Sequence, residues 1–307
     1  MRFLMRLLSM AAAVFGLLLI LTFSVSLIRI LWETKSKNRP RVEVIELSGV
    51  IMSSTRILEE LKQAEEDDQV KALVVHINSP GGMVAPSQEI YAALLRVDQK
   101  KPVIASMASL AASGGYYAAL GARKIFANPG TLTASIGVIM EFANTQKLFQ
   151  WAKIERFALK AGRFKDVGSP LREMSKEDRA LLEGMLTNIH AQFSQAVKER
   201  RKLNDTELAS TADGRVMTGE QAVQTKLVDT LGGIEEAISE AKTAASLPAD
   251  AFVHFPSSKR GVLRKFFLGE DDPSEKSFLG SLGDVLSLAS GHSRMSGARI
   301  WLLAPLR

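Results

Sequence analysis

The sequence predicts an α/β fold with parallel strands, and three observations lead to that prediction. Short apolar runs typical of buried strands alternate with longer stretches typical of helices. Hydrophobic residues make up 46% of the 307 residues, which is ample for a core. Two of the apolar runs end near a Gly-Gly pair, which favours a tight turn from a strand into a helix.

The expected elements follow from the hydrophobic pattern along the chain. In the first half we expect strands over 42–51, 71–77 and 102–107, and helices over 57–64, 86–97 and 116–120. In the second half we expect helices over 144–152, 175–201, 218–225 and 234–245, and strands over 155–159 and 227–229. Apolar residues recur every four positions in the longest helix, which predicts a buried face formed by Leu181, Met185, Ile189, Phe193 and Val197.

The N-terminus is apolar enough to be a membrane anchor. No charged residue occurs from Leu7 to Ile28, a stretch that would be about 33 Å long as a helix, against about 30 Å for a bilayer core. The alternatives are a secretory signal peptide cleaved near Ser24 to Ser26, or a buried core helix. More basic residues follow the span than precede it, so the positive-inside rule by itself would keep the rest of the chain in the cytoplasm.

Charge and cysteine content narrow the function classes. The net charge is +6, but no basic stripe is interleaved with aromatic residues, and much of the excess flanks the apolar N-terminus. We therefore expect a membrane surface as a partner and no nucleic acid. The sequence contains no cysteine, which removes disulfides, thiolate nucleophiles and cysteine-bound zinc. The chemistry expected below needs no metal and no other cofactor.

The residues from Ala105 to Ile139 contain the strongest candidate for a nucleophile. An apolar run enters this stretch, and Ser113 lies between small residues and a Gly-Gly pair at the expected start of a helix. A hydroxyl at such a break can be exposed to substrate while backbone N–H groups stay free to bind an anion. The stretch lacks the first glycine of the G-x-S-x-G pattern, which disfavours an α/β-hydrolase.

A serine nucleophile needs a base, and either a histidine or a lysine would serve. None of the four histidines (His76, His190, His254 and His292) is close to Ser113 in the sequence, although a long-range pairing stays possible. His76 lies in an apolar strand, where a paired core histidine is the more common case. A lysine base must be neutral, and burial or nearby cations favour that form.

Glycines offer candidates for stabilising a developing oxyanion. Gly81 and Gly82 follow a strand and would let the backbone approach a substrate closely, with N–H groups aimed at it. A plain tight turn between strand and helix explains the same pair.

Four motifs together resemble those of the signal peptide peptidase A family of membrane-anchored serine-lysine proteases. In chain order they are Asn78-Ser79-Pro80-Gly81-Gly82, Ala112-Ser113-Gly114-Gly115-Tyr116-Tyr117, Thr133-Ala134-Ser135-Ile136-Gly137-Val138, and the run from Gly162 to Pro170. The likeness covers about Val42 to Ala245, and the anchor and single catalytic copy are similar to the short bacterial form.

This resemblance implies a fold, a site and a mode of assembly. The fold would be the crotonase-like α/β fold shared with the Clp protease subunit. Ser113 would be the nucleophile, Lys165 the general base, and Ser135 the serine that orients the lysine. Gly81 and Gly114 would form the oxyanion hole. Several copies would assemble into a homo-oligomer whose active sites join serine and lysine of neighbouring subunits.

The residues around Lys165 refine this expectation. By itself Lys165 reads as an exposed loop lysine, and Ser135 as a turn or helix-start serine. Nearby Arg163 and Arg172 would lower the pKa of Lys165, whereas Asp166 would raise it if its carboxylate pointed inward. We therefore expect Asp166 to face away. Tyr116 and Tyr117 are expected in the core or in subunit contacts.

The organisation expected from these observations has four parts. They are a signal anchor over 1–30, a charged linker over 31–41, a protease domain over 42–255, and a C-terminal segment of undefined role over 256–307. The expected activity is endopeptidase cleavage of remnant signal peptides and other unstructured peptides at the membrane. The expected location is the bacterial inner membrane, with a single span and the catalytic domain outside the cytoplasm. The alternatives are a crotonase-type acyl-CoA enzyme and a non-catalytic membrane scaffold of the same fold.

Overall fold

A computed structural model describes residues 39–255 and 301–303, together with single residues at 16, 20, 21, 23 and 24. Most of the predicted anchor and most of the C-terminal segment lie outside the described residues. In the described part of the chain, no helix combines the length and the apolar character needed to cross a membrane.

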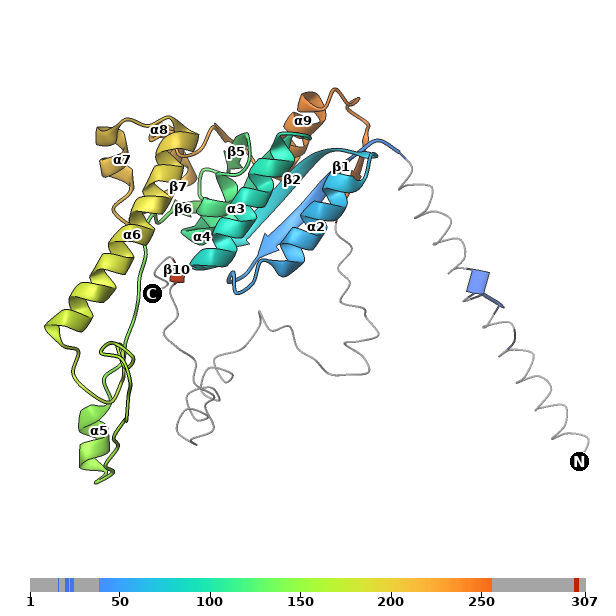
Figure 1. Ribbon diagram of the computed structural model, residues 1–307. Coiled ribbons are helices and arrows are strands. Elements are labelled where there is room, and N and C mark those ends of the chain that lie inside the picture. Colours follow the sequence, from blue (N-terminus) through green and yellow to red (C-terminus); the bar gives the residue numbers. More distant parts are fainter. Residues whose placement is uncertain (1–15, 17–19, 22, 25–38, 256–300, 304–307) are drawn as a thin grey trace, which may run out of the picture.

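The body is built on an eight-stranded sheet, which follows the predicted α/β class (Figure 1). The strand order is β7-β6-β4-β2-β1-β9, and β5 pairs with β4 and β8. The strands are β1 (Arg41–Ser48), β2 (Val70–Ser79), β4 (Val103–Ala112), β5 (Lys124–Ala127), β6 (Leu132–Ala134), β7 (Val216–Thr218), β8 (Thr230–Leu231) and β9 (Phe252–His254). The central pairs β1–β2 and β2–β4 are parallel, as predicted, whereas β6 and β7 pair antiparallel.

Strand β4 divides the sheet because its two halves have different neighbours. Its first half pairs with β5, from Ile104 to Met107, and its last residues pair with β6, from Leu110 to Ala112. The strand is therefore longer than the sequence predicts, and it runs without a break into Ser113.

Helices cover both faces of the sheet. Helices α2 (Thr55–Glu66) and α3 (Val84–Asp98) pack on one face, and α9 (Ile234–Ala244) packs on the other (Figure 1). Apolar side chains at helical spacing explain each contact. In α2, for example, the buried residues are Ile57, Leu61 and Ala64. With both faces covered, β2 is buried over most of its length, as is usual for a parallel sheet.

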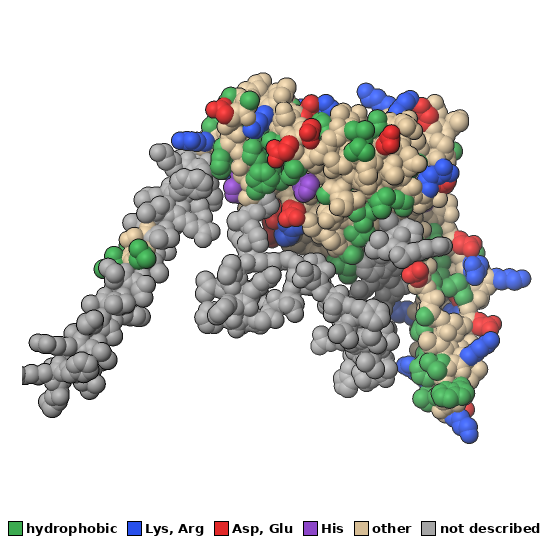
Figure 2. Space-filling view, turned by 180° about the vertical axis from the view of Figure 1, so that it is seen from behind, with side chains coloured by type: hydrophobic (Ala, Val, Ile, Leu, Met, Phe, Trp, Pro, Cys, Tyr) green, Lys and Arg blue, Asp and Glu red, His purple; other side chains and the backbone are tan. Residues whose placement is uncertain are grey.

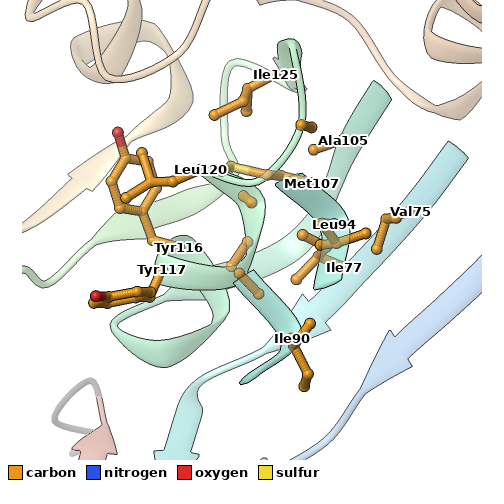
Figure 3. Close-up of a cluster of buried hydrophobic side chains, with 14 of the residues drawn as sticks. Val75, Ile77, Ile90, Leu94, Ala105, Met107, Tyr116, Tyr117, Leu120 and Ile125 are labelled. Carbon is orange, nitrogen blue, oxygen red and sulfur yellow. The ribbon is translucent and has the colours of Figure 1, made fainter. Parts of the chain in front are cut away.

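The larger core lies between the sheet, α3 and the short helix α4 (Gly114–Ala119), as Figure 3 shows. Tyr116 is fully buried, and its hydroxyl donates a hydrogen bond to the Leu227 carbonyl at 2.9 Å. Burial raises the pKa of this hydroxyl. Tyr117 packs edge-on against Tyr91 and also contacts Phe193. Both tyrosines are therefore core residues, as expected, and they fix α4 in place.

A segment that we call the arm, residues 141–175, leaves the body between β6 and α6. It contains the helix α5 (Gln146–Trp151) and leads into α6 (Lys176–Arg201), which returns the chain to the body. Figure 1 shows α5 far from the sheet, beyond the first turns of α6. The chain then continues through α7 (Asp205–Thr211) and α8 (Gly219–Gln224).

Three sequence-based expectations are wrong, two of them on or beside the arm. No strand forms over 155–159, where Phe157 and Leu159 are exposed; strand pairing needs a neighbouring strand, and the arm offers none. In α6 only the second half of the predicted face is buried, since Leu181 and Met185 are exposed where the helix extends past the body. The strand expected at 227–229 lies just afterwards, as β8.

Candidate active site

The candidate site lies at the carboxyl edge of the central parallel strands. Because β1, β2 and β4 run in the same direction, the residues that follow them meet at one edge of the sheet. The short strand β3 (Gly81–Met83) follows β2 there, and Ser113 follows β4. Ile51, just beyond β1, forms a bridge to Gly82.

Ser113 has a strained backbone and a buried hydroxyl. Its φ is 53° and its ψ is −117°, a region that side-chain-bearing residues seldom adopt. Its N–H donates to the Ala134 carbonyl at 2.8 Å, which anchors this conformation. The Oγ atom is buried and has no hydrogen-bond partner among the described residues. Burying a hydroxyl group without a hydrogen-bond partner costs free energy. The strained backbone and the unpaired hydroxyl together indicate that Ser113 has a functional role.

Ser135 lies beside Ser113 at the end of the neighbouring strand. The β4–β6 register pairs Ala112 with Ala134, so the next residue of each strand is a serine. Ala134 and Ser135 also have positive φ values, of 65° and 52°. The N–H of Ser135 donates to the Arg215 carbonyl at 2.8 Å, and the side chain is almost fully buried.

The glycines lie against one another beside the serine. A Cβ atom on Gly114 would lie 3.2 Å from the Gly82 nitrogen and 3.3 Å from the Gly81 Cα, so only glycine fits there without displacement. Gly81 has a φ of 97°, and its N–H donates to Ser79 Oγ at 3.1 Å. The Gly81 amide is thus engaged in this protomer, and the amides of Gly82 and Gly114 flank the same space.

One edge of β3 is paired with a distant part of the chain. The strand β10 (Trp301–Leu303) pairs antiparallel with β3, with Leu302 opposite Gly82. The backbone edge next to Ser113 therefore accepts an extended segment in antiparallel register.

No described histidine is positioned to serve Ser113 as a base. His76 lies within β2, where burial lowers its pKa. His190 contacts the Ala212 carbonyl at 2.9 Å, and His254 pairs with Glu43 at 2.5 Å. The fourth histidine falls outside the described residues.

Lys165 lies on the arm, away from Ser113. Its side chain is exposed, and its N–H donates to the Gly162 carbonyl at 3.2 Å in a series of tight turns. Figure 1 shows α5 and the rest of the arm projecting away from α4, at whose start Ser113 lies. The structure therefore brings Ser113 and Ser135 together with Gly81 and Gly114. It does not bring Lys165 to them within one protomer.

Both arginines that lie near Lys165 in the sequence form ion pairs in the structure. Arg163 pairs with Glu177, and Arg172 pairs with Asp166 and Asp178.

Comparison with known proteins identifies the family. The model of peptidase family S49 matches residues 96–248, and the model of Clp protease matches residues 41–140. A putative protease of Synechocystis is 40% identical over 222 residues, covering 72% of this chain and 80% of that protein. The chain belongs to peptidase family S49. This is the signal peptide peptidase A family, as the motifs predict.

Two further S49 relatives carry family names. A putative signal peptide peptidase of Enterococcus faecium is 32% identical over 66% of this chain and 60% of its own length. The chloroplastic serine protease SPPA of Arabidopsis thaliana is 31% identical, and the match covers 65% of this chain and 30% of the plant protein. Family membership supports a serine peptidase as the class of enzyme and confirms the likeness to Clp protease.

Sequence reasoning missed three residues whose hydrogen bonds stabilise the backbone around the candidate site. Ser79 accepts the Gly81 N–H, and Thr133 donates to the Ala111 carbonyl at 2.7 Å, tying β6 to β4 beside the two serines. Thr131 makes a similar bond to the Ala108 carbonyl at 2.6 Å. The alternation of Thr131, Leu132 and Thr133 was a usable signal, since alternate residues of a strand point to the same face.

Proposed function

We propose that this chain is a membrane-anchored serine endopeptidase whose active site is completed by a second copy of the chain. Ser113 of one copy is the nucleophile, and Lys165 of a neighbour is the general base. Ser135 orients that lysine through a hydrogen bond. The observation that carries the proposal is the buried Ser113 hydroxyl, which has no hydrogen-bond partner among the described residues, while Lys165 belongs to the projecting arm.

The surface of the arm supports a partner copy as the source of the lysine. Large apolar side chains are exposed along it, including Trp151 (82%), Phe157 (88%) and Leu159 (94%). Figure 2 shows hydrophobic side chains gathered on this projecting part, next to charged ones. Soluble protomers seldom expose so many large apolar groups in one segment, and such patches mark interaction surfaces. A neighbour that covered the arm would also bury Lys165, which favours a neutral amine.

The mechanism is acyl transfer. The neutral Lys165 amine accepts the proton of Ser113 Oγ as that oxygen attacks the peptide carbonyl carbon. The negative charge on the carbonyl oxygen is stabilised by amide N–H groups of Gly114 and of the Gly81–Gly82 turn. The Lys165 ammonium then gives its proton to the leaving amine. Finally, water loses a proton to Lys165 and attacks the acyl-enzyme, and the Lys165 ammonium returns that proton to Ser113 Oγ as the serine leaves.

The proposed substrates are unstructured peptides, among them remnant signal peptides at the membrane. The β3 edge supports this class, because it already pairs with an extended segment of the chain in antiparallel register. Pairing of this kind binds a peptide through its backbone, so it favours extended chains over folded proteins. The relative from Enterococcus faecium is named as a signal peptide peptidase.

The proposed location is the bacterial inner membrane, with the apolar N-terminus as a single span and the catalytic domain outside the cytoplasm. The charges that flank the span favour the opposite orientation, so the topology calls for its own measurement. We expect added protease to digest the domain in spheroplasts but not in intact cells. Protection in spheroplasts would refute this orientation.

Covalent labelling tests the nucleophile and the base together. A fluorophosphonate probe is expected to modify Ser113 in the purified full-length protein, because a base-activated serine reacts where ordinary serines do not. Lys165→Ala should abolish labelling, whereas Lys147→Ala, which removes an exposed lysine from the same arm, should leave it intact.

Other outcomes of the same experiment favour other functions. An intact assembly that neither labels nor cleaves peptides at any pH would indicate a scaffold. Turnover of acyl-CoA without labelling of Ser113 would indicate a crotonase-type enzyme, which needs no serine nucleophile. Undiminished labelling of Lys165→Ala would refute Lys165 as the base.

A further inference from the structure

The loop that carries Lys165 is held together by a chain of backbone turns. The N–H of Val167 donates to the Phe164 carbonyl at 3.1 Å, and the N–H of Ser169 donates to the Asp166 carbonyl at 3.1 Å. These bonds fix the loop internally. The position of the loop relative to α6 depends on contacts between side chains of the two segments.

Two ion pairs connect the loop to the first turn of α6. The Arg163–Glu177 pair is exposed on both sides and contributes little, so the stronger connection is made by Arg172. Its Nε donates to Asp166 Oδ2 at 2.9 Å, and its Nη2 reaches both Oδ1 at 3.1 Å and the Asp166 carbonyl at 3.2 Å. Its Nη1 donates to Asp178 Oδ2 at 2.5 Å. One guanidinium therefore joins the residue next to Lys165 to the first turn of α6, and the planar fork of arginine suits this geometry.

Asp178 is a firm anchor for the other end. Its N–H donates to Ser175 Oγ at 3.0 Å, and its carboxylate accepts the Ser175 N–H at 3.1 Å, which forms the capping box of α6. The side chain is buried. Asp166 is held from a second side by Lys160, whose Nζ lies 2.5 Å from Asp166 Oδ1.

We propose that Arg172 is a positioning residue that fixes the Lys165 loop against α6 through Asp166 and Asp178. This inference rests on the proposed function, in which Lys165 must reach Ser113 of a neighbour. Arg172 touches neither substrate nor serine. It acts by holding the loop in the one orientation from which the lysine can accept the Ser113 proton.

The charges of this cluster stay constant over the working pH range. The hydrogen bond from Arg172 is the main reason that the pKa of Asp166 lies below its usual value, and it lowers the pKa of Asp178 to about 2. A depressed carboxylate pKa means that the pairing is complete above the unfolded value of about 3.9 and is lost only as the pH falls toward the folded one. Between pH 5 and 9, therefore, the cluster does not titrate.

The test compares Arg172 variants in the full-length protein. We expect Arg172→Gln to lower kcat by about 10- to 100-fold, because a displacement of about 1 Å in a catalytic group has effects of that size. KM should change less than about twofold, because Arg172 makes none of the contacts that bind the substrate equally in the ground state and the transition state. Because the cluster does not titrate, the loss should be equal at all pH values between 5 and 9. Arg172→Lys should recover part of the activity, since a single ammonium can hold one carboxylate.

Two further variants separate positioning from general stability. Asp166→Asn should reproduce the loss, and the double variant Arg172→Gln/Asp166→Asn should be no worse than either single one, since both break the same link. Arg179→Gln, which removes an exposed arginine paired with Glu183 on the same helix, should keep wild-type kcat. Assembly should match wild type in all of these variants. The melting temperature should fall only for those that change Arg172, which leave the buried Asp178 carboxylate without its guanidinium.

The outcomes distinguish this inference from the proposed function. Activity retained in Lys165→Ala refutes the proposed function, and the inference falls with it. An inactive Lys165→Ala together with an Arg172→Gln that keeps its kcat refutes the positioning role alone. A loss that appears only as lower melting temperature or failed assembly refutes it as well. If Arg172→Gln does not fold, the kcat of Asp166→Asn decides.

Discussion

Mixing Ser113→Ala protomers with Lys165→Ala protomers is expected to restore peptidase activity that neither variant has alone. Each single variant should lose about 10⁴-fold or more in kcat, as removal of a catalytic nucleophile or base does. The two lesions lie on different parts of the protomer, Ser113 at the sheet edge and Lys165 on the arm. A mixed assembly therefore contains some sites in which an intact serine meets an intact lysine.

The amount restored tests the geometry of sharing. If each site takes its serine from one copy and its lysine from one neighbour, equal mixing of subunits gives roughly a quarter of the wild-type sites. The measurement is peptide hydrolysis after the two variants are dissociated and reassembled together, with each variant reassembled alone as the control. No recovery from an intact mixed assembly would show that serine and lysine act within one protomer.

Gly82→Ala is expected to damage both stability and catalysis. The new Cβ would lie 2.2 Å from the Ile51 carbonyl oxygen and 2.6 Å from the Ile51 nitrogen, distances at which backbone must move. Overpacking of this kind costs about 1–3 kcal/mol in the free energy of unfolding. Displacement of β3 would also shift the amides that face Ser113, and loss of one such donor lowers kcat by about 10²- to 10³-fold.

A matched glycine provides the control. At Gly130 a Cβ would have no atom within 4 Å, so Gly130→Ala should change the free energy of unfolding by less than about 0.5 kcal/mol and leave kcat unchanged. The measurements are chemical denaturation and steady-state peptide hydrolysis on both variants. Wild-type stability and kcat in Gly82→Ala would show that β3 can move without consequence, which contradicts its role at the site.

Most of the body could be predicted because its elements carry local signals that tertiary contacts reinforce. The strand before Ser113 and the helix after it follow from an apolar run, a Gly-Gly break and two tyrosines that enter the core. Gly81 and Gly82 could be predicted as positions of close backbone approach because they follow a strand. The contact of Gly82 with Gly114 needed the structure, because the two come from different strand ends.

The arm and the first half of α6 were predicted less well, and their errors are of one kind. Leu159 and Met185 carry an apolar pattern that within one protomer would mean burial, yet both are exposed. Patterns of hydrophobicity record that a side chain is covered, but they do not record which chain covers it. In the proposed assembly, a face covered by a partner copy would therefore have the same sequence pattern as a face in the core.

By itself the sequence determined the α/β class, the family and the identity of the candidate nucleophile, since each depends on short runs of residues whose meaning is local. Only the tertiary structure decided that the Ser113 hydroxyl has no hydrogen-bond partner among the described residues, that Lys165 belongs to a projecting arm, and that Arg172 pairs with both Asp166 and Asp178. The physical reason is that each of these properties depends on how separate segments of the chain are arranged in space. The strain and the ion pairs that result exist only once the chain has folded.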